Sequence, residues 1–464
     1  MSGCCGRALP RRALCILGVL CGLAVIPPAQ AVTLVIATVD NGQLLQLQAL
    51  SSAFEQAHPD IRLRWITLTE NQLRQHVSSD LATHAGLVDV LTIGLYEVPI
   101  WARRGWLRPI RPAPGYDPGD LLDNIRAGLS HRGQLYAAPI YGESSMLMYR
   151  KDLMRQAGLT MPANPTWTEI AAIAAGLNDP ANEVHGICLR GTPGWGENMA
   201  LVTTMVNAFG GQWFDLEWRP QLQSKPWRDA VGLYVELLTR YGPKDAAARG
   251  FNENLALFQA GRCALWVDAT VAGGFVANPE QSRWADSIGF AQAPAEVTAK
   301  GSHWLWAWSL AIPASDDATR EAAAQKFVNW ATSRDYLELV ASEYGWGLVP
   351  SGTRRSTYAN PQFQRAAPWA AMELEAIRTA DPTDATLPKS PYVGVQFAVI
   401  PEFRTIGDAV GEFIAAALDG KLSVEEALAR SQHVTSRQLV LGGYPKALER
   451  PQDCQPQRAS GNCR

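Results

Sequence analysis

The chain has 464 residues and a formal net charge of −3, with 47% hydrophobic and 18% charged residues. This composition is typical of a globular protein, and the weakly acidic balance argues against nucleic acid or an anionic membrane surface as a partner. One hydrophobic core rarely supports more than about 300 residues, so we expect two lobes. The 16 Trp residues are unusual, and because a buried indole N–H needs a partner, some of them are predicted to line a binding surface.

The N-terminus has the three parts of an export signal. Arg7, Arg11 and Arg12 precede an apolar run over 13–26, and the small-residue pattern Ala29-Gln-Ala31 follows. This order predicts a cleaved signal peptide over 1–31 and a secreted, soluble, periplasmic or extracytoplasmic mature chain. Cleavage removes three Arg and no acid, which takes the formal charge from −3 to −6.

The mature chain begins with alternating strand and helix patterns. We predict a buried strand over 33–38, a helix over 44–57, a half-buried strand over 61–65, a helix over 73–81 and a buried strand over 88–94. Strands that alternate with helices imply parallel crossovers and therefore an α/β lobe. The alternation then repeats, which predicts a second α/β lobe, with a capping box at 166–169, a strand over 184–188, a helix over 227–241 and a strand over 264–267.

Four cysteines follow the predicted signal peptide: Cys188, Cys263, Cys454 and Cys463. In an oxidising compartment the natural pairs are Cys188–Cys263 and Cys454–Cys463. Buried free thiols are the alternative for the first pair. None of the spacings suits a zinc site.

The motifs of common enzymes are missing from the sequence. There is no HExxH pair, no GxSxG elbow and no phosphate-binding loop that ends in Gly-Lys-Ser/Thr. We therefore expect no enzyme activity, no cofactor and no metal site. A secreted glycosidase or lyase is the alternative, because acids such as Glu143, Glu197 and Asp268 are able to supply the two carboxylates that glycoside hydrolysis needs.

A series of segments, all in the same order, resembles the family 1 extracellular solute-binding proteins of ABC transporters, and within that family the sorbitol/mannitol-binding branch. The first is Phe54-Glu-Gln-Ala-His58-Pro59-Asp60-Ile61, and the others lie at 39–42, 68–71, 96–102, 141–146, 188–191, 194–199, 251–256, 266–270 and 304–308. The resemblance covers about residues 32 to 435. Asp40 and Gly142 depart from it, since Asn and Ala are usual at these two positions.

This resemblance implies a periplasmic-binding-protein-like fold of two α/β lobes with a ligand cleft between them. Lobe one would comprise 32–141 and 305–350, lobe two 145–300 and 360–445, and residues 446–464 would be a C-terminal tail. The function implied is the polyol or sugar receptor of an importer, which binds a polyol such as mannitol or sorbitol by lobe closure without turnover. Its partners would be this small molecule and the membrane permease subunits, and the protein would be a monomer. A sensor role without transport uses the same cleft and stays open.

A polyol receptor needs carboxylates and amides for hydroxyl groups and aromatic faces for C–H groups. The resembling segments supply this mixture, and the candidate ligand-binding residues are Asn41, Glu70, Tyr96, Glu143, Arg190, Trp195, Glu197, Asn198, Asp268, Trp304 and Trp306.

Most of these candidates also have a structural interpretation. Asn41 and Asp268 are able to cap helices, as is one of Glu197 and Asn198, and Glu70 favours a helix dipole. Glu143 is alternatively a rim charge or a hinge partner, Tyr96 a core residue, and Arg190 the partner of a nearby acid. Trp304, Trp306 and Trp308 would share one face of a strand, and we expect at most two of them in the cleft, with Trp308 in the core.

Overall fold

The computed structural model describes residue 3 and residues 31–444. The predicted signal peptide, apart from residues 3 and 31, lies outside the described residues. So do the predicted tail over 446–464 and the proposed Cys454–Cys463 pair.

Six strands form the sheet of the first lobe, in the order β2-β1-β3-β12-β4 with β7 also paired to β12. Strand β1 runs parallel to β2 and β3, which confirms the predicted parallel crossovers, whereas β12 is antiparallel to β3, β4 and β7. The strands are β1 (Val32–Val39), β2 (Ile61–Leu68), β3 (Val90–Ile93), β4 (Leu107–Arg108), β7 (Ala137–Glu143) and β12 (Trp306–Pro313). Late strand β12 thus completes a sheet that begins at the N-terminus.

Helices α1 and α2 follow the first two strands and cover this sheet. Helix α1 buries Leu44, Leu47 and Phe54, and it ends at His58, where Pro59 stops the pattern. Helix α11 packs on β1 and β12. The helices of this lobe are α1 (Gly42–Ala57), α2 (Glu70–Thr83), α3 (Glu97–Arg103), α4 (Asp123–Gly128), α11 (Ala318–Ala331) and α12 (Arg334–Tyr344), and a small hairpin joins β5 (Ser130–His131) to β6 (Gln134–Leu135).

The sheet of the second lobe has four strands in the order β11-β8-β10-β9. It is mixed, because β10 is parallel to β9 but antiparallel to β8. The strands are β8 (Ser145–Arg150), β9 (His185–Cys188), β10 (Cys263–Ala269) and β11 (Ile288–Gln292). A disulfide joins Cys188 at the end of β9 to Cys263 at the start of β10, with a Cα–Cα distance of 5.9 Å.

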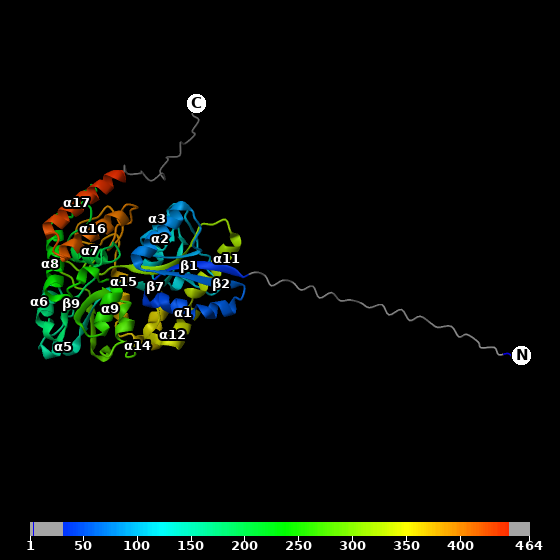
Figure 1. Cartoon of the computed structure of the whole chain (residues 1–464), viewed down its shortest axis with the longest axis horizontal. Coiled ribbons are helices and arrows are strands. Elements are labelled where there is room, and N and C mark those ends of the chain that lie inside the picture. The colour runs from blue at the N-terminus through cyan, green and yellow to red at the C-terminus, as the bar shows by residue number, and fades with distance from the viewer. Residues whose placement is uncertain (1–2, 4–30, 445–464) are drawn as a thin grey trace, which may run out of the picture.

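Helices surround the second sheet (Figure 1), and the short helix α13 lies against first-lobe residues instead, since Arg355 donates to the carbonyl groups of Gly119 and Leu121. The capping box at Thr166 and Glu169 starts α6, as predicted, and α8, α16 and α17 pack against one another. The helices are α5 (Lys151–Gln156), α6 (Trp167–Leu177), α7 (Asn198–Ala208), α8 (Lys225–Tyr241), α9 (Phe251–Gln259), α10 (Ala272–Val276), α13 (Arg355–Ala359), α14 (Pro361–Ala366), α15 (Ala370–Thr379), α16 (Phe403–Leu418) and α17 (Val424–Leu441).

The two lobes are joined where β7 ends and β8 begins. Here the Ser144 hydroxyl donates to the Trp304 carbonyl at 2.8 Å, and the Gly142 N–H donates to the Ser351 carbonyl at 2.9 Å, so three chain segments meet. A Cβ atom at position 142 would lie 2.2 Å from the carbonyl oxygen of Gly352. This close backbone approach leaves no room for a side chain at position 142, which favours glycine there.

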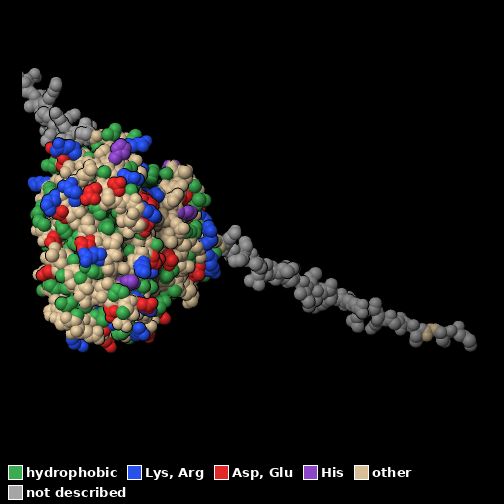
Figure 2. Space-filling view, turned by 60° about the vertical axis from the view of Figure 1, so that its left-hand side comes forward, with side chains coloured by type: hydrophobic (Ala, Val, Ile, Leu, Met, Phe, Trp, Pro, Cys, Tyr) green, Lys and Arg blue, Asp and Glu red, His purple; other side chains and the backbone are tan. Residues whose placement is uncertain are grey.

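The surface carries both signs of charge. Lys and Arg side chains are interspersed with Asp and Glu on the face in Figure 2. Within residues 31–444, no helix combines the length and the apolar composition that a bilayer span requires.

Candidate functional site

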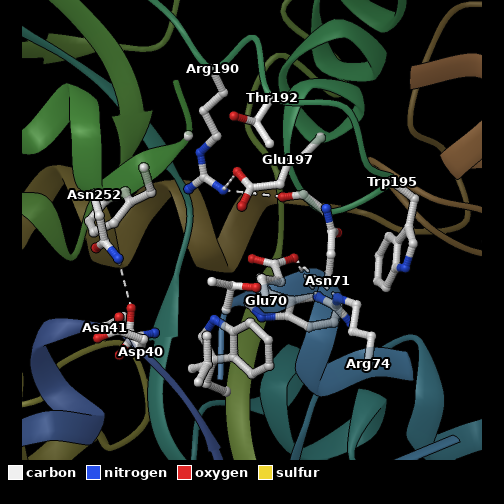
Figure 3. Close-up of a pocket in the computed structure, with 18 of the residues that line it drawn as sticks. Asp40, Asn41, Glu70, Asn71, Arg74, Arg190, Thr192, Trp195, Glu197 and Asn252 are labelled. Atoms are coloured by element: carbon white, nitrogen blue, oxygen red, sulfur yellow. Dashed lines mark hydrogen bonds and ion pairs between the residues drawn. The ribbon is translucent and has the colours of Figure 1, made fainter. Parts of the chain in front are cut away.

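A cavity of about 270 Å³ lies between the two lobes. Its walls come from the loops after β1 and β2, from β7 and β12, and from the segments before α7 and α9. Eight of the eleven predicted ligand-binding residues line it: Asn41, Glu70, Glu143, Arg190, Trp195, Glu197, Trp304 and Trp306. Figure 3 shows side chains from both lobes converging on this cavity.

Asn41 is both a helix cap and a cavity residue. Its Oδ1 accepts from the Leu44 N–H at 3.2 Å, which starts α1, and its Nδ2 donates to the Tyr141 hydroxyl at 2.8 Å. The two interpretations from the sequence are therefore compatible. Tyr141, which also lines the cavity, was not among the predicted residues.

Glu70 begins α2 and pairs with Arg74 one turn later, at 2.8 Å. Arg74 also bonds Glu97, and its guanidinium lies over the Trp195 ring, 3.9 Å from the centroid. This stacking places a first-lobe cation against a second-lobe indole (Figure 3). Arg74 was missed from the sequence, although its i,i+4 spacing from Glu70 on a predicted helix was a usable signal.

Arg190 is held from behind by Asp268. The Arg190 Nη2 atom lies 2.7 Å from the Asp268 carboxylate, and Nε donates to both carboxylate oxygens at 3.1 Å. Asp268 also accepts from the Trp266 indole and from the Ala269 N–H, and it has no exposed surface. Asp268 does not line the cavity, and the protein fills its acceptor positions, so its predicted contact with the ligand stays a prediction.

The carboxylates of Glu143 and Glu197 face the cavity without such support. Glu143 ends β7 and is 6% exposed, and no side chain among the described residues hydrogen-bonds or ion-pairs with its carboxylate. The Glu197 Oε2 atom is buried without a hydrogen bond, 3.7 Å from Arg190 Nη1. Burial raises the pKa of each carboxyl group to about 8, although the Arg190 charge acts in the opposite direction.

Three indoles of the β12 segment form the aromatic wall. Trp304, Trp306 and Trp308 all line the cavity, which corrects the expectation that Trp308 lies only in the core. The Arg74 guanidinium lies 5.0 Å from the ring centroids of both Trp306 and Trp308, and Trp195 packs edge-on to Trp306. Because these contacts cover the rings, three indoles on one face do not form an exposed apolar patch.

Two further predicted residues, Tyr96 and Asn198, also lie outside the cavity lining. Tyr96 packs behind Trp195, and its hydroxyl donates to the Ile400 carbonyl at 3.0 Å, so the ring lies outside the cavity lining. Asn198 is fully buried at the start of α7, and its Nδ2 donates to the Gly411 carbonyl at 2.9 Å. Both polar groups are used to hold second-lobe helix α16 and the segment before it.

Two side-chain hydrogen bonds bridge the mouth of the cavity. Asn71 Nδ2 donates to the Pro193 carbonyl at 3.0 Å. Asn252 Nδ2 donates to the Asp40 carbonyl at 2.8 Å (Figure 3). Each bond joins the first lobe to the second, so this structure is a closed form. The sequence offered no signal for either bond, because both depend on how the lobes meet.

The chemistry of the cavity is that of hydrogen bonding and stacking. Among the described residues, no group of three or more His, Cys, Asp or Glu side chains is arranged to hold a metal ion. The lining combines carboxylates, guanidinium groups, amides, hydroxyl groups and indoles. The fold and the site together define a two-lobed binding protein that encloses a small polar molecule.

Comparison with known proteins identifies the family. The family of bacterial extracellular solute-binding proteins matches residues 41–338. A mannitol-binding protein of Pseudomonas aeruginosa is 52% identical over 417 residues, which cover 90% of this chain and 95% of the relative. This chain therefore belongs to the bacterial extracellular solute-binding proteins, and it is the substrate-binding component of an ABC transporter rather than an enzyme. The glycosidase or lyase alternative is thereby excluded.

Solved structures agree with this assignment. An ABC transporter solute-binding protein of Agrobacterium vitis, solved with bound D-mannitol, is 51% identical with a TM-score of 0.88, and the match covers 90% of this chain and 100% of that one. A ribitol complex from Agrobacterium radiobacter is 22% identical with a TM-score of 0.78, over 88% of this chain and 99% of that one. The second likeness concerns the fold alone.

Proposed function

We propose that this protein binds mannitol or a closely related acyclic polyol in the cavity between its lobes. The observation that carries the proposal is the pairing, in one cavity of about 270 Å³, of Glu143 and Arg190 with the indoles of Trp304 and Trp306. A polyol offers alternating hydroxyl and C–H groups, which match acceptors, donors and aromatic faces in turn. The two relatives that are more than 50% identical, one named for mannitol and one solved with it, support this ligand class.

Each wall has a separate task in this proposal. Arg190, fixed by Asp268, donates to two neighbouring hydroxyl groups. Glu143 and Glu197 accept from hydroxyl groups, which satisfies carboxylates that otherwise have no hydrogen-bond partner for at least one oxygen. Contacts from both lobes exist only when the cleft is closed, so the ligand shifts the protein toward the closed form.

The cellular role follows from the family and from the N-terminal pattern. We propose that residues 1–31 are a cleaved signal peptide, that the mature protein acts in the periplasm as a monomer, and that its closed form delivers the polyol to membrane permease subunits. Transport, rather than sensing alone, is the role supported by the relatives described as transporter components.

Titration calorimetry of the mature protein tests the ligand. D-Mannitol is expected to bind with micromolar or tighter affinity, D-sorbitol more weakly, and maltose not at all, and the bound polyol is recovered chemically unchanged. Glu143→Ala should weaken mannitol binding at least about tenfold. Glu236→Ala is the matched control, because Glu236 pairs with Arg240 on the surface of α8. Mannitol binding that is absent, or equal in both variants, would contradict the proposal.

A further inference from the structure

The charges around the cavity are unbalanced. Its lining contains five acids and two cations, and no Lys or His: the acids are Asp40, Glu70, Glu143, Glu197 and Glu253, and the cations are Arg74 and Arg190. Asp40 and Glu253 lie at the exposed rim, whereas the other five are buried or half-buried. An anionic ligand therefore enters a site whose own acids outnumber its cations.

Both cations are already committed to the protein. All three nitrogens of the Arg74 guanidinium bond Glu70 or Glu97, and one face is covered by Trp195. Arg190 directs Nε and Nη2 to Asp268, and its Nη1 donates to a backbone carbonyl at 3.1 Å. Each positive charge is therefore already offset by a carboxylate of the protein, although the remaining N–H groups of Arg190 still donate to ligand hydroxyl groups.

Two acids, in contrast, have weak or no ion pairing: Glu143 has no ion pair, and Glu197 shares Arg190 with Asp268. Glu143 is more than nine-tenths buried, and its carboxylate has no hydrogen bond or ion pair among the described residues. Glu197 lies 3.7 Å from Arg190, whose nearer partner is Asp268, and its Oε2 has no hydrogen bond. A buried carboxylate without a partner is costly, and a ligand cation would remove that cost.

We propose that the cavity selects polyols by charge, accepts amino polyols as well as neutral ones, and places the ammonium group against Glu143 and Glu197. Polyols that end in a carboxylate or a phosphate bind more weakly, because the acids of the lining outnumber its cations and an anion favours the protonated form of these two residues. This inference rests on the proposed polyol function and extends it to a cationic class of ligand.

The protonation of the two acids is compatible with such a ligand. Burial raises the pKa of both carboxyl groups to about 8, so at about pH 7 the loss of each proton costs about tenfold in affinity. The ammonium group then supplies the missing positive charge. The charged groups that face the two acids are Arg190, Asp268, Glu70, Glu373 and Glu253. Arg190 is the only cation among these groups, and its own carboxylate partner offsets its charge.

A series of three matched ligands tests the proposal. D-Mannamine, D-mannitol and D-mannonate share one carbon skeleton and differ only at one terminal group, which is an ammonium, a hydroxyl or a carboxylate. Calorimetric titration of the mature protein near neutral pH should show mannamine within about tenfold of mannitol, and mannonate at least about a hundredfold weaker than mannamine. Mannonate that binds as well as mannamine, or mannamine that does not bind while mannitol does, would overturn the inference.

Two variants assign the selectivity to its residues. Glu143→Gln and Glu197→Gln should each lower the mannamine preference over mannonate by about tenfold, whereas Glu236→Gln on the surface should leave the preference unchanged. A purely structural effect would weaken all three ligands equally and would contradict the assignment. If the unaltered protein does not bind mannitol, the proposed function is wrong. The ratio of mannamine affinity to mannonate affinity tests the charge selection separately.

Discussion

The unpaired carboxyl group of Glu143 should make the empty protein less stable at alkaline pH. Burial raises its folded-state pKa from 4.5 to about 8, so between these values the folded protein holds a proton that the unfolded chain has lost. Stability therefore falls as pH rises through this window, and the loss is complete above about pH 8. Glu143→Gln keeps the shape of the protonated side chain and cannot ionise, so this substitution should remove the loss.

The size of the effect follows from the raised pKa. Each unit of pKa corresponds to about 1.4 kcal/mol. The rise in the Glu143 pKa from 4.5 to about 8 therefore limits the loss of unfolding free energy to about 5 kcal/mol. Water that enters an open cleft and the high effective dielectric constant of protein interiors reduce this value. We therefore expect Glu143→Gln to stabilise the ligand-free protein by about 2 kcal/mol above pH 8.

Urea unfolding of the ligand-free protein at about pH 5 and about pH 9 measures this difference. The unfolding free energy of Glu143→Gln should equal that of the unaltered protein at the lower pH and should be higher than it at the higher pH. Glu236→Gln, which changes an exposed acid, is the control. A variant that is less stable at the higher pH, or a difference that is the same at both values, would refute the reasoning.

Three other substitutions have defined outcomes. Asp268→Ala leaves buried Arg190 without the carboxylate that lies 2.7 Å away, so it should lower the unfolding free energy by about 3 kcal/mol. It should also weaken mannitol binding in calorimetry. If both values are unchanged, Asp268 does not hold Arg190 in place. Replacement of Cys188 and Cys263 by Ala opens a link across a sequence separation of 75 and should cost about 4 kcal/mol in urea unfolding, whereas a cost near zero argues against the disulfide. Asn252→Ala removes a 2.8 Å bond across the cleft and should speed polyol release about fivefold in stopped-flow measurements, and an unchanged release rate would show that this bond does not hold the lobes closed.

Much of the fold could be predicted from local patterns. The strand and helix periodicities located the first five elements of the mature chain to within a few residues, and the capping box at Thr166 located the start of α6. The antiparallel pairing of β12 with β3 could not be predicted, because it joins segments more than 200 residues apart. Local patterns do not encode such pairings.

The site was predicted less completely, for a physical reason. A polar side chain after a strand either faces the cleft or satisfies a buried partner, and the sequence does not distinguish these cases. Asp268 and Tyr96 proved to serve protein partners, whereas Asn41 serves both roles. Asn71 and Asn252 escaped notice because their partners lie on the opposite lobe. Their function depends on closure, which has no local signature.

A crystal structure of the mature protein with D-mannitol would show directly whether the cavity between the lobes binds a polyol. We expect one mannitol molecule there, with hydroxyl groups within hydrogen-bond distance of Glu143, Glu197 and Arg190. Its C–H groups should lie against the Trp304 and Trp306 rings. Mannitol bound outside this cavity, or bound there without contact to Glu143 and Arg190, would contradict this expectation.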